Sequence, residues 1–487
     1  MLKTVKSLLS AAAIYGLGTV ASKFIGLFLL PFFTRALSPS EYGVFETLSV
    51  LLFLLTTIGT LGLDSAMLRF YYESNDSNYR RSVVSSAFWL ATTAGIALTV
   101  AGIALSGPLN DILFRGVLEV SLLQVTMLTV AVSIPNTIQL ALFQTKREPG
   151  KYSWLTLLRF SVMYGVSIWL LLRGDGVMGI MVAQWIAYAC SLVLGFVFSR
   201  RDLVVGVSGQ LTKPMMIFSA PLIVGSVSAW LLSSSDRFFL VRLSTLEELG
   251  LYSLGSRFAS IIQLAVLAFQ MAWPQFVLSN ARETGSEQTQ ARILTYYLFV
   301  GIVLVLVVSL FAPELLFVFA TERYSAASAV VLLLCCSSLF YGCYFVFGIV
   351  LSVTKRTLSI LPVMLPPLVV NIALNTYLVP ALGGKGSAIA STSAYFFMAA
   401  LAFFFTHRLM PIPYEWRRIS KLIAAATIVL LVPEFVTFEA FASAILFKCA
   451  LLAAFLGLLF ALRFFLDIEL VTLRRLLGMS ESIKNPI

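Results

Sequence analysis

The chain has 487 residues, of which 59% are hydrophobic and only 12% are charged, and its mean hydropathy is +0.94. A soluble domain carries roughly 45–50% apolar and about 25% charged residues, so this chain has too few polar side chains to cover a surface that faces water. The composition predicts an all-α integral membrane protein and excludes a large soluble enzyme. The net charge of +11 does not indicate nucleic-acid binding, because the basic residues lie between apolar runs rather than along one stripe.

Apolar runs follow one another along the whole chain, and each is long enough to cross about 30 Å of hydrocarbon at roughly 20 residues per helix. About fourteen transmembrane helices are predicted. Their expected bounds are 8–33, 44–71, 83–106, 118–143, 152–172, 177–199, 214–241, 250–278, 291–313, 326–353, 358–380, 386–406, 420–436 and 440–462. The links between these runs are too short to hold a catalytic domain.

The basic residues alternate between rich and poor links. Twenty-three of the 34 Lys and Arg residues fall on one side, in links or within two residues of a predicted span's edge. Six fall in links on the other side, and the remaining five lie deeper within predicted spans. Cytoplasmic links carry the excess of Lys and Arg in membrane proteins. Both termini are therefore predicted to lie in the cytoplasm.

The two halves of the chain share a short pattern. Residues 35–45 read RALSPSEYGVF and residues 242–252 read RLSTLEELGLY, an offset of 207 that aligns an Arg, a Glu and a Gly. Each segment contains a capping box, in which a hydroxyl and a carboxylate satisfy the free N–H groups that open a helix. Each half is therefore expected to start its second span from the same kind of turn.

Two further matches keep nearly the same offset. Residues 145–147 and 354–356 both read TKR, and residues 174–176 and 384–386 both place a residue between two glycines. The offset spans six predicted helices, an even number, so the two halves have the same orientation. The sequence predicts two parallel six-helix lobes around a central cavity, with an N-terminal lobe at 1–205, a C-terminal lobe at 206–412, and two additional helices and a tail at 413–487.

Three stretches carry a family resemblance. They are GTVASKFIGLFLLPFFTRALSPSEYGVF, SSSDRFFLVR…ELGLYSLGSRF and NIALNTYLVPALGGKGSAIAST. They resemble the O-antigen and exopolysaccharide repeat-unit flippases of polysaccharide biosynthesis, within the multidrug/oligosaccharidyl-lipid/polysaccharide exporter superfamily. The resemblance extends over about the whole chain and consists of patterns of helix starts and packing rather than a catalytic signature.

The resemblance implies a two-lobed protein of the bacterial inner membrane. Its expected activity is to move an undecaprenyl-pyrophosphate-linked oligosaccharide from the inner to the outer leaflet by alternating access, for O-antigen or exopolysaccharide synthesis. Membrane lipids, a polysaccharide polymerase and a chain-length regulator are the expected partners. The two additional helices are expected to form a groove for the lipid tail, as in lipid II flippases. A lipid II flippase and a drug/cation antiporter of the same superfamily stay open as alternatives.

Charged residues within the predicted spans mark candidate sites, because each costs about 2.5–3.5 kcal/mol at mid-membrane. Lys23, Arg237 and Arg257 come from the first two spans of the two halves and are predicted to bind pyrophosphate, since Arg and Lys suit its oxygens. The alternative is internal neutralisation, of Lys23 by Asp64 and of Arg257 by Asp236. Both interpretations predict that these side chains avoid lipid.

The carboxylates Asp64 and Asp236 are candidates for coupling transport to H⁺ or Na⁺, and no other cofactor is expected. Asn371 and Asn375 lie one helical turn apart, where they would hydrogen-bond either sugar hydroxyls or a neighbouring helix. Arg159 is expected to extend toward the cytoplasmic headgroups.

A membrane glycan polymerase or ligase is the alternative from another functional class. Such enzymes carry a large outer loop, whereas every outer link here is short. The five Cys residues show no CxxC spacing, only one His is present, and the sequence contains no GxxxxGK[ST] phosphate loop. The chain is therefore predicted to be a transporter rather than an enzyme.

Overall fold

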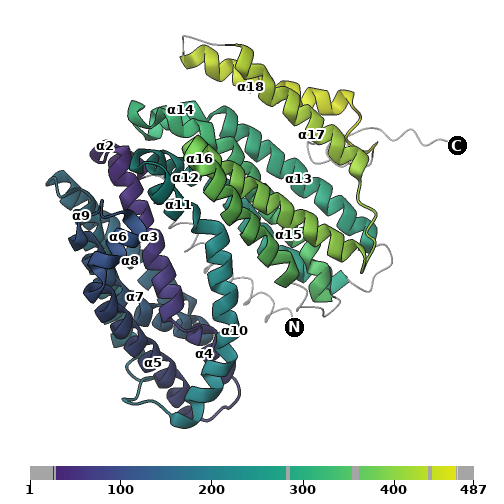
Figure 1. Ribbon diagram of the computed structural model, residues 1–487. Helices are drawn as coiled ribbons and strands as arrows, with labels where there is room; N and C mark the ends of the chain where they lie inside the picture. The colour runs from purple at the N-terminus through teal and green to yellow at the C-terminus, as the bar shows by residue number, and fades with distance from the viewer. Residues whose placement is uncertain are drawn as a thin grey trace. The chain divides into compact units, whose positions relative to one another are not determined.

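The computed structural model describes residue 26, residues 29–280, 286–353, 361–436 and 441–467, and residue 469. Seventeen α-helices, α2 to α18, account for most of this part of the chain (Figure 1). The described residues divide into two compact units. The first extends to Arg257 and also contains Leu316–Leu334 and Leu361–Phe397. The second contains Phe258–Leu315, Cys335–Ile360 and the residues from Met398 onward.

Long helices of membrane length make up most of the fold, and short helices lie between some of them. Up to the middle of the chain they are α2 (Leu30–Ala36), α3 (Pro39–Gly59), α4 (Leu63–Tyr71), α5 (Ser77–Ala104), α6 (Ser106–Phe114), α7 (Val120–Thr145), α8 (Pro149–Leu172), α9 (Gly176–Ser199), α10 (Gly209–Ser234) and α11 (Asp236–Leu243). The others are α12 (Leu246–Asn280), α13 (Ser286–Leu310), α14 (Ala312–Phe319), α15 (Ser328–Val353), α16 (Leu361–His407), α17 (Trp416–Leu431) and α18 (Phe441–Ala461), with 3₁₀ turns η1 (Glu322–Ala327) and η3 (Val432–Phe435).

Eleven helical segments in the described part of the chain are long and apolar enough to cross a membrane, which confirms the all-α, multi-span prediction. One of them, Pro362–His407, contains two predicted spans, because α16 continues through a sharp kink at Gly383 (φ 53°, ψ −131°). The predicted last-but-one span corresponds to α17, which has only 16 residues. Most of the predicted first span lies outside the described residues. The total of fourteen therefore stays a prediction.

Two predicted continuous spans are interrupted. The span expected at 44–71 forms α3 and α4, separated by a turn in which Leu61 and Gly62 both have positive φ. The span expected at 214–241 forms α10 and α11, but Ser235 between them keeps right-handed helical angles, so no turn separates these two helices. Asp64 and Asp236 then lie in the first turns of α4 and α11, where free N–H groups favour a carboxylate.

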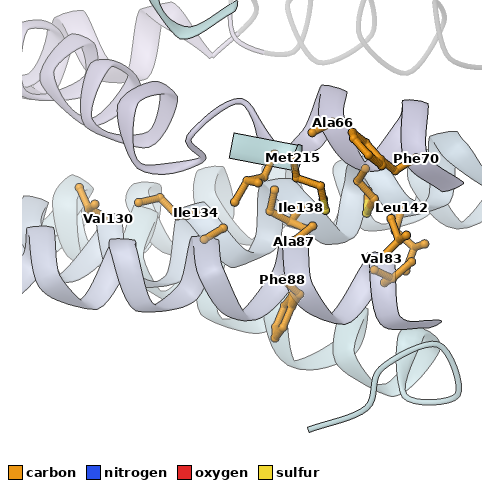
Figure 2. Close-up of a cluster of buried hydrophobic side chains, with 14 of the residues drawn as sticks. Ala66, Phe70, Val83, Ala87, Phe88, Val130, Ile134, Ile138, Leu142 and Met215 are labelled. Atoms are coloured by element: carbon orange, nitrogen blue, oxygen red, sulfur yellow. The ribbon is translucent and has the colours of Figure 1, made fainter. Parts of the chain in front are cut away.

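A continuous apolar core holds the first part of the chain together. Helices α4, α5, α7 and α10 contribute buried side chains that interlock between them, including Ala66, Phe70, Phe88, Ile134 and Met215 (Figure 2). Small residues such as Ala66 allow the helices to approach closely, and the larger ones fill the space that is left. This core fixes α4, which carries Asp64, and the first part of α10.

The duplicated helix starts meet each other in the structure. The Ser38 side chain accepts from the Glu41 N–H while Glu41 accepts from the Ser38 N–H, which confirms the first capping box. Gly43 and Gly250, the aligned glycines, face one another: a Cβ on Gly43 would lie 2.8 Å from Leu246 O and 2.9 Å from Gly250 N. The repeat therefore places the starts of α3 and α12 in backbone contact.

The second capping box is only half formed. Thr245 Oγ1 accepts from the Glu248 N–H at 3.2 Å, but the Glu248 carboxylate accepts from the Gly384 N–H at 2.9 Å instead of from its own helix start. Glu41 likewise lies beside Gly176, the equivalent glycine turn of the first half. Each half thus places an acidic side chain against its own glycine turn, as a duplication requires. The lobe boundaries at 205 and 412 stay predictions.

In the second unit, α17 and α18 pack against each other and against α13. Arg418 on α17 donates to Glu415 at 2.8 Å, to Glu469 at 2.8 Å and to the Phe464 carbonyl at 3.0 Å. Lys448, within α18, pairs with Glu314 at 2.5 Å. Polar contacts therefore hold these two helices where apolar packing alone would leave their positions less specific.

Candidate functional site

Arg257 and Glu46 form an ion pair between α12 and α3, close to the contact of the duplicated helix starts. The Nε and Nη2 atoms of Arg257 donate to Glu46 Oε1 at 3.1 and 2.5 Å. The Glu46 side chain is 5% exposed, whereas that of Arg257 is 47% exposed. The pair has a buried negative end and an accessible positive end, so it presents a cation from within membrane-length helices.

Asp236 opens α11 and is almost completely buried, at 4% exposure. Its Oδ2 atom accepts hydrogen bonds from the Tyr252 hydroxyl and from Ser391 Oγ, the latter at 3.1 Å. Its Oδ1 atom has no hydrogen-bond partner within the described residues. A buried carboxylate with an unused oxygen is costly unless a proton or a cation completes it.

A chain of buried amides and hydroxyls connects this carboxylate to α16. Ser387 Oγ donates to Asn375 Oδ1 at 2.7 Å, Asn375 Nδ2 donates to Asn371 Oδ1 at 3.1 Å, and Asn371 Nδ2 donates to Ser391 Oγ at 3.4 Å. Oxygen atoms of this kind suit hard cations. Across the described ranges no group of three His, Cys, Asp or Glu residues gathers as a transition-metal site would require.

Arg237 follows Asp236 but points to a different set of atoms. Its Nη2 donates to Ser256 Oγ at 3.1 Å, and its guanidinium lies 6.0 Å from the centre of the Tyr252 ring. Its Nε is buried without a hydrogen-bond partner in the part of the chain that is described. Arg237 therefore borders the Asp236 network without pairing with its carboxylate.

Asp64 lines a cavity of about 520 Å³ between α3, α4, α7, α8, α9 and α10. Thr56, Thr57 and Thr60 supply a polar wall, and Arg159 lies in the same lining. The Arg159 side chain was expected to extend toward the headgroups. It donates instead to Asn136 Oδ1, at 3.3 Å. The cavity combines one acid, one base and hydroxyls, which suits a polar occupant.

The predicted site residues thus separate into groups. Asp236, Asn371 and Asn375 form one buried network, Arg237 borders it, and Arg257 pairs elsewhere. The alternative that Asp236 neutralises Arg257 is wrong, because Glu46 holds that guanidinium. Lys23 lies outside the described residues.

Sequence reasoning missed three contributors. Glu46 was not singled out although a carboxylate within an apolar helix is a signal in itself. Tyr252 and Ser391 carry no such signal, because a Tyr or Ser in a membrane helix is common and only the fold brings both to Asp236.

Comparison with known families decides the identity. A family model described as polysaccharide biosynthesis protein matches residues 8–278, more than half of the chain, and a second one described as MatE matches residues 221–377. The chain belongs to the polysaccharide biosynthesis protein family. Within curated relatives, the succinoglycan biosynthesis transport protein ExoT of Rhizobium meliloti (strain 1021) is 23% identical over 255 residues, which cover 52% of this chain and 49% of that protein. The match thus spans about half the length of this relative.

Solved structures of two kinds share the fold of this family member. The lipid II flippase MurJ in an inward closed conformation aligns with a TM-score of 0.74 and 16% identity, over 92% of this chain and 99% of that one. An inward-facing multidrug resistance MATE family transporter of the MOP superfamily aligns with a TM-score of 0.66 and 15% identity, over 79% and 94%. The predicted resemblance to the multidrug/oligosaccharidyl-lipid/polysaccharide exporters is confirmed, and the chain has their all-helical fold.

Proposed function

We propose that this protein moves an undecaprenyl-pyrophosphate-linked oligosaccharide repeat unit from the inner to the outer leaflet of a bacterial inner membrane, with both termini in the cytoplasm. Family membership supports a role in polysaccharide biosynthesis. The observation that carries the proposal is the Arg257–Glu46 pair, which offers a half-exposed guanidinium from helices of membrane length.

The chemistry of the cargo explains why such a guanidinium is useful. A pyrophosphate cannot cross hydrocarbon with its charges bare, and a planar guanidinium binds two of its oxygens at once. Glu46 holds Arg257 in place and lowers the cost of keeping a cation among apolar helices, while the exposed side of Arg257 faces the cargo. Arg237 and Lys23 are proposed to add positive charge along the path.

The test measures appearance of the lipid-linked glycan in the outer leaflet, in vesicles that contain the full chain. We expect Arg257→Gln to reduce transport by about tenfold or more, since one lost charge-assisted contact is worth roughly 1.5–3 kcal/mol. Arg323→Gln, which removes one exposed charge in a link, serves as the matched control and is expected to transport normally.

Removal of Arg257 also leaves Glu46 buried and unpaired, so lost activity alone is ambiguous. The double variant Glu46→Gln/Arg257→Gln removes both charges and is expected to recover thermal stability without recovering transport. Normal transport by the double variant would contradict the proposed role of the guanidinium.

A lipid II flippase is the second candidate, favoured by the alignment with MurJ over almost that whole chain. Both cargoes carry a polyprenyl pyrophosphate, so Arg257 does not distinguish them. The same vesicle assay with lipid II as cargo does: faster movement of lipid II than of an oligosaccharide repeat unit would favour this candidate.

We further propose that Asp236 couples transport to an ion gradient. The buried Oδ1 of Asp236 and the oxygens of Asn371 and Asn375 support a site for Na⁺, and the short reach to Tyr252 and Ser391 supports a site for a proton. Either ion would neutralise the carboxylate and change the packing of α11 against α16 during the transport cycle.

Asp236→Asn keeps the shape of the side chain but cannot exchange an ion. We expect it to abolish the dependence of transport on the gradient, with a fall of about tenfold in rate under a gradient. Imposing a Na⁺ gradient and a pH gradient separately identifies the ion. Asp64→Asn tests the other candidate carboxylate, and loss of gradient dependence in that variant but not in Asp236→Asn would contradict this assignment.

A further inference from the structure

A second recess, distinct from the cavity that Asp64 lines, is rich in basic side chains. It has a volume of about 740 Å³ and opens where α5 begins, α7 ends, α8 begins and α9 ends. Because consecutive long helices run in alternating directions, these four ends belong to the same end of the helical bundle (Figure 1). Its basic lining residues are Arg80, Arg81, Lys146, Lys151, Arg200 and Arg201.

Half of these basic side chains are occupied by the protein itself. Arg80 donates to the backbone carbonyls of residues 71 and 74 at 3.2 and 2.9 Å. Lys146 binds both carboxylate oxygens of Asp202 at 3.0 and 2.9 Å, and Lys151 pairs with Glu148 at 2.9 Å. These contacts fix the three side chains in the lining, where Asp202 and Glu148 offset the charges of the two lysines.

The other half have no protein partner. Arg81, Arg200 and Arg201 take part in no hydrogen bond or ion pair among the described residues, and all three are exposed. The preference of cytoplasmic links for basic residues explains their sign. It does not explain why three guanidiniums line one recess, where like charges repel each other unless an anion lies between them.

We propose that this recess binds the phosphate or pyrophosphate group of a membrane lipid. Guanidiniums bind phosphate oxygens through paired N–H groups, and basic recesses between membrane helices hold anionic headgroups. Val84, Val197 and Phe198 supply an apolar wall for the first carbons beyond the headgroup. The volume lies within the range of about 300–1,000 Å³ usual for ligand pockets. The proposal does not depend on Arg257 or on transport.

Native mass spectrometry of the full chain in detergent, titrated with a single lipid, tests this. We expect R81Q/R200Q/R201Q to bind phosphatidylglycerol or a polyprenyl pyrophosphate about tenfold more weakly than the unaltered chain. K213Q/R292Q/R417Q removes the same charge on the same predicted side but outside the recess, and is expected to bind as the unaltered chain does. Phosphatidylcholine serves as the lipid without net charge.

If R81Q/R200Q/R201Q weakens the binding of phosphatidylglycerol or of the polyprenyl pyrophosphate, the proposed site is supported. Which of the two lipids is affected identifies the source of the phosphate. Inorganic pyrophosphate is also expected to displace the bound lipid from the unaltered chain more effectively than sulfate, a measurement that needs no variant. Equal losses in the two triple variants, or no loss in either, would overturn the proposal, because binding would then reflect overall charge alone.

Discussion

Among single residues, the aligned glycines Gly43 and Gly250 allow the two duplicated helix starts, those of α3 and α12, to contact each other. A Cβ on Gly250 would overlap the carbonyl group of Pro39, and the obstacle is backbone rather than a flexible side chain. Close approach of two helices in a membrane depends on such small residues, because van der Waals packing is one of the main forces that hold the helices together.

We therefore expect Gly250→Ala to destabilise the protein by about 1–3 kcal/mol through overpacking. Gly165→Ala is the matched control, because that helical glycine has open space around its Cβ position and alanine favours a helix. Thermal unfolding of the purified chain compares the two. Equal midpoints would show that α3 and α12 are not in tight backbone contact.

A residue's partner also decides what it can do. Arg257 and Arg237 look alike in sequence, yet a buried carboxylate holds the first and a serine hydroxyl holds the second. Of these two arginines, Arg257 is the one that a carboxylate holds while its side chain is half-exposed, which is why the proposed contact with pyrophosphate rests on it.

At the scale of elements, interrupted helices position both candidate carboxylates. A helix start carries free N–H groups and a partial positive charge, so it stabilises an acid that a continuous membrane helix would not. Asp64 follows a turn with two left-handed residues, whereas Asp236 follows a residue that keeps right-handed helical angles. The two acids therefore lie after different local backbone conformations.

The contact between α17 and the segment after α18 is expected to depend on pH, because it includes the Arg418–Glu469 ion pair. Glu469 accepts hydrogen bonds from Arg418, from the Tyr296 hydroxyl at 2.6 Å and from the Leu466 N–H at 2.9 Å. Burial alone would raise the pKa of Glu469, but these hydrogen bonds and the charge of Arg418 outweigh it and lower that pKa. A lowered folded-state pKa stabilises the attachment at neutral pH, and this contribution is lost as the pH falls below the ordinary Glu range and through the lowered value.

Hydrogen exchange of residues 462–467 measures this loss. We expect opening of this segment to increase below about pH 4, relative to intrinsic exchange rates. In Glu469→Gln the segment is expected to be open to the same extent at neutral and acidic pH. A pH response that persists in this variant would place the titrating group elsewhere.

At the scale of the whole molecule, the duplication is the feature that links sequence to mechanism. Each half places an acidic residue against its own glycine turn, Glu41 beside Gly176 and Glu248 at Gly384. Many transporters that work by alternating access are built from internal repeats, and the predicted parallel arrangement of the two halves is one form of such a repeat. The family and the fold are both consistent with a transporter, and the vesicle assays identify its cargo.

Local hydropathy and short periodic patterns are enough to predict the membrane environment, the helical class, the order of most spans and the internal repeat, because each is recorded in neighbouring residues. The pairing of Arg257 with Glu46, the network that links Asp236 to Asn371, and the recess of basic side chains arise only when the helices pack together. Those contacts join residues more than a hundred positions apart in most cases. Partners at such separations are chosen by helix packing, and no local pattern records that choice.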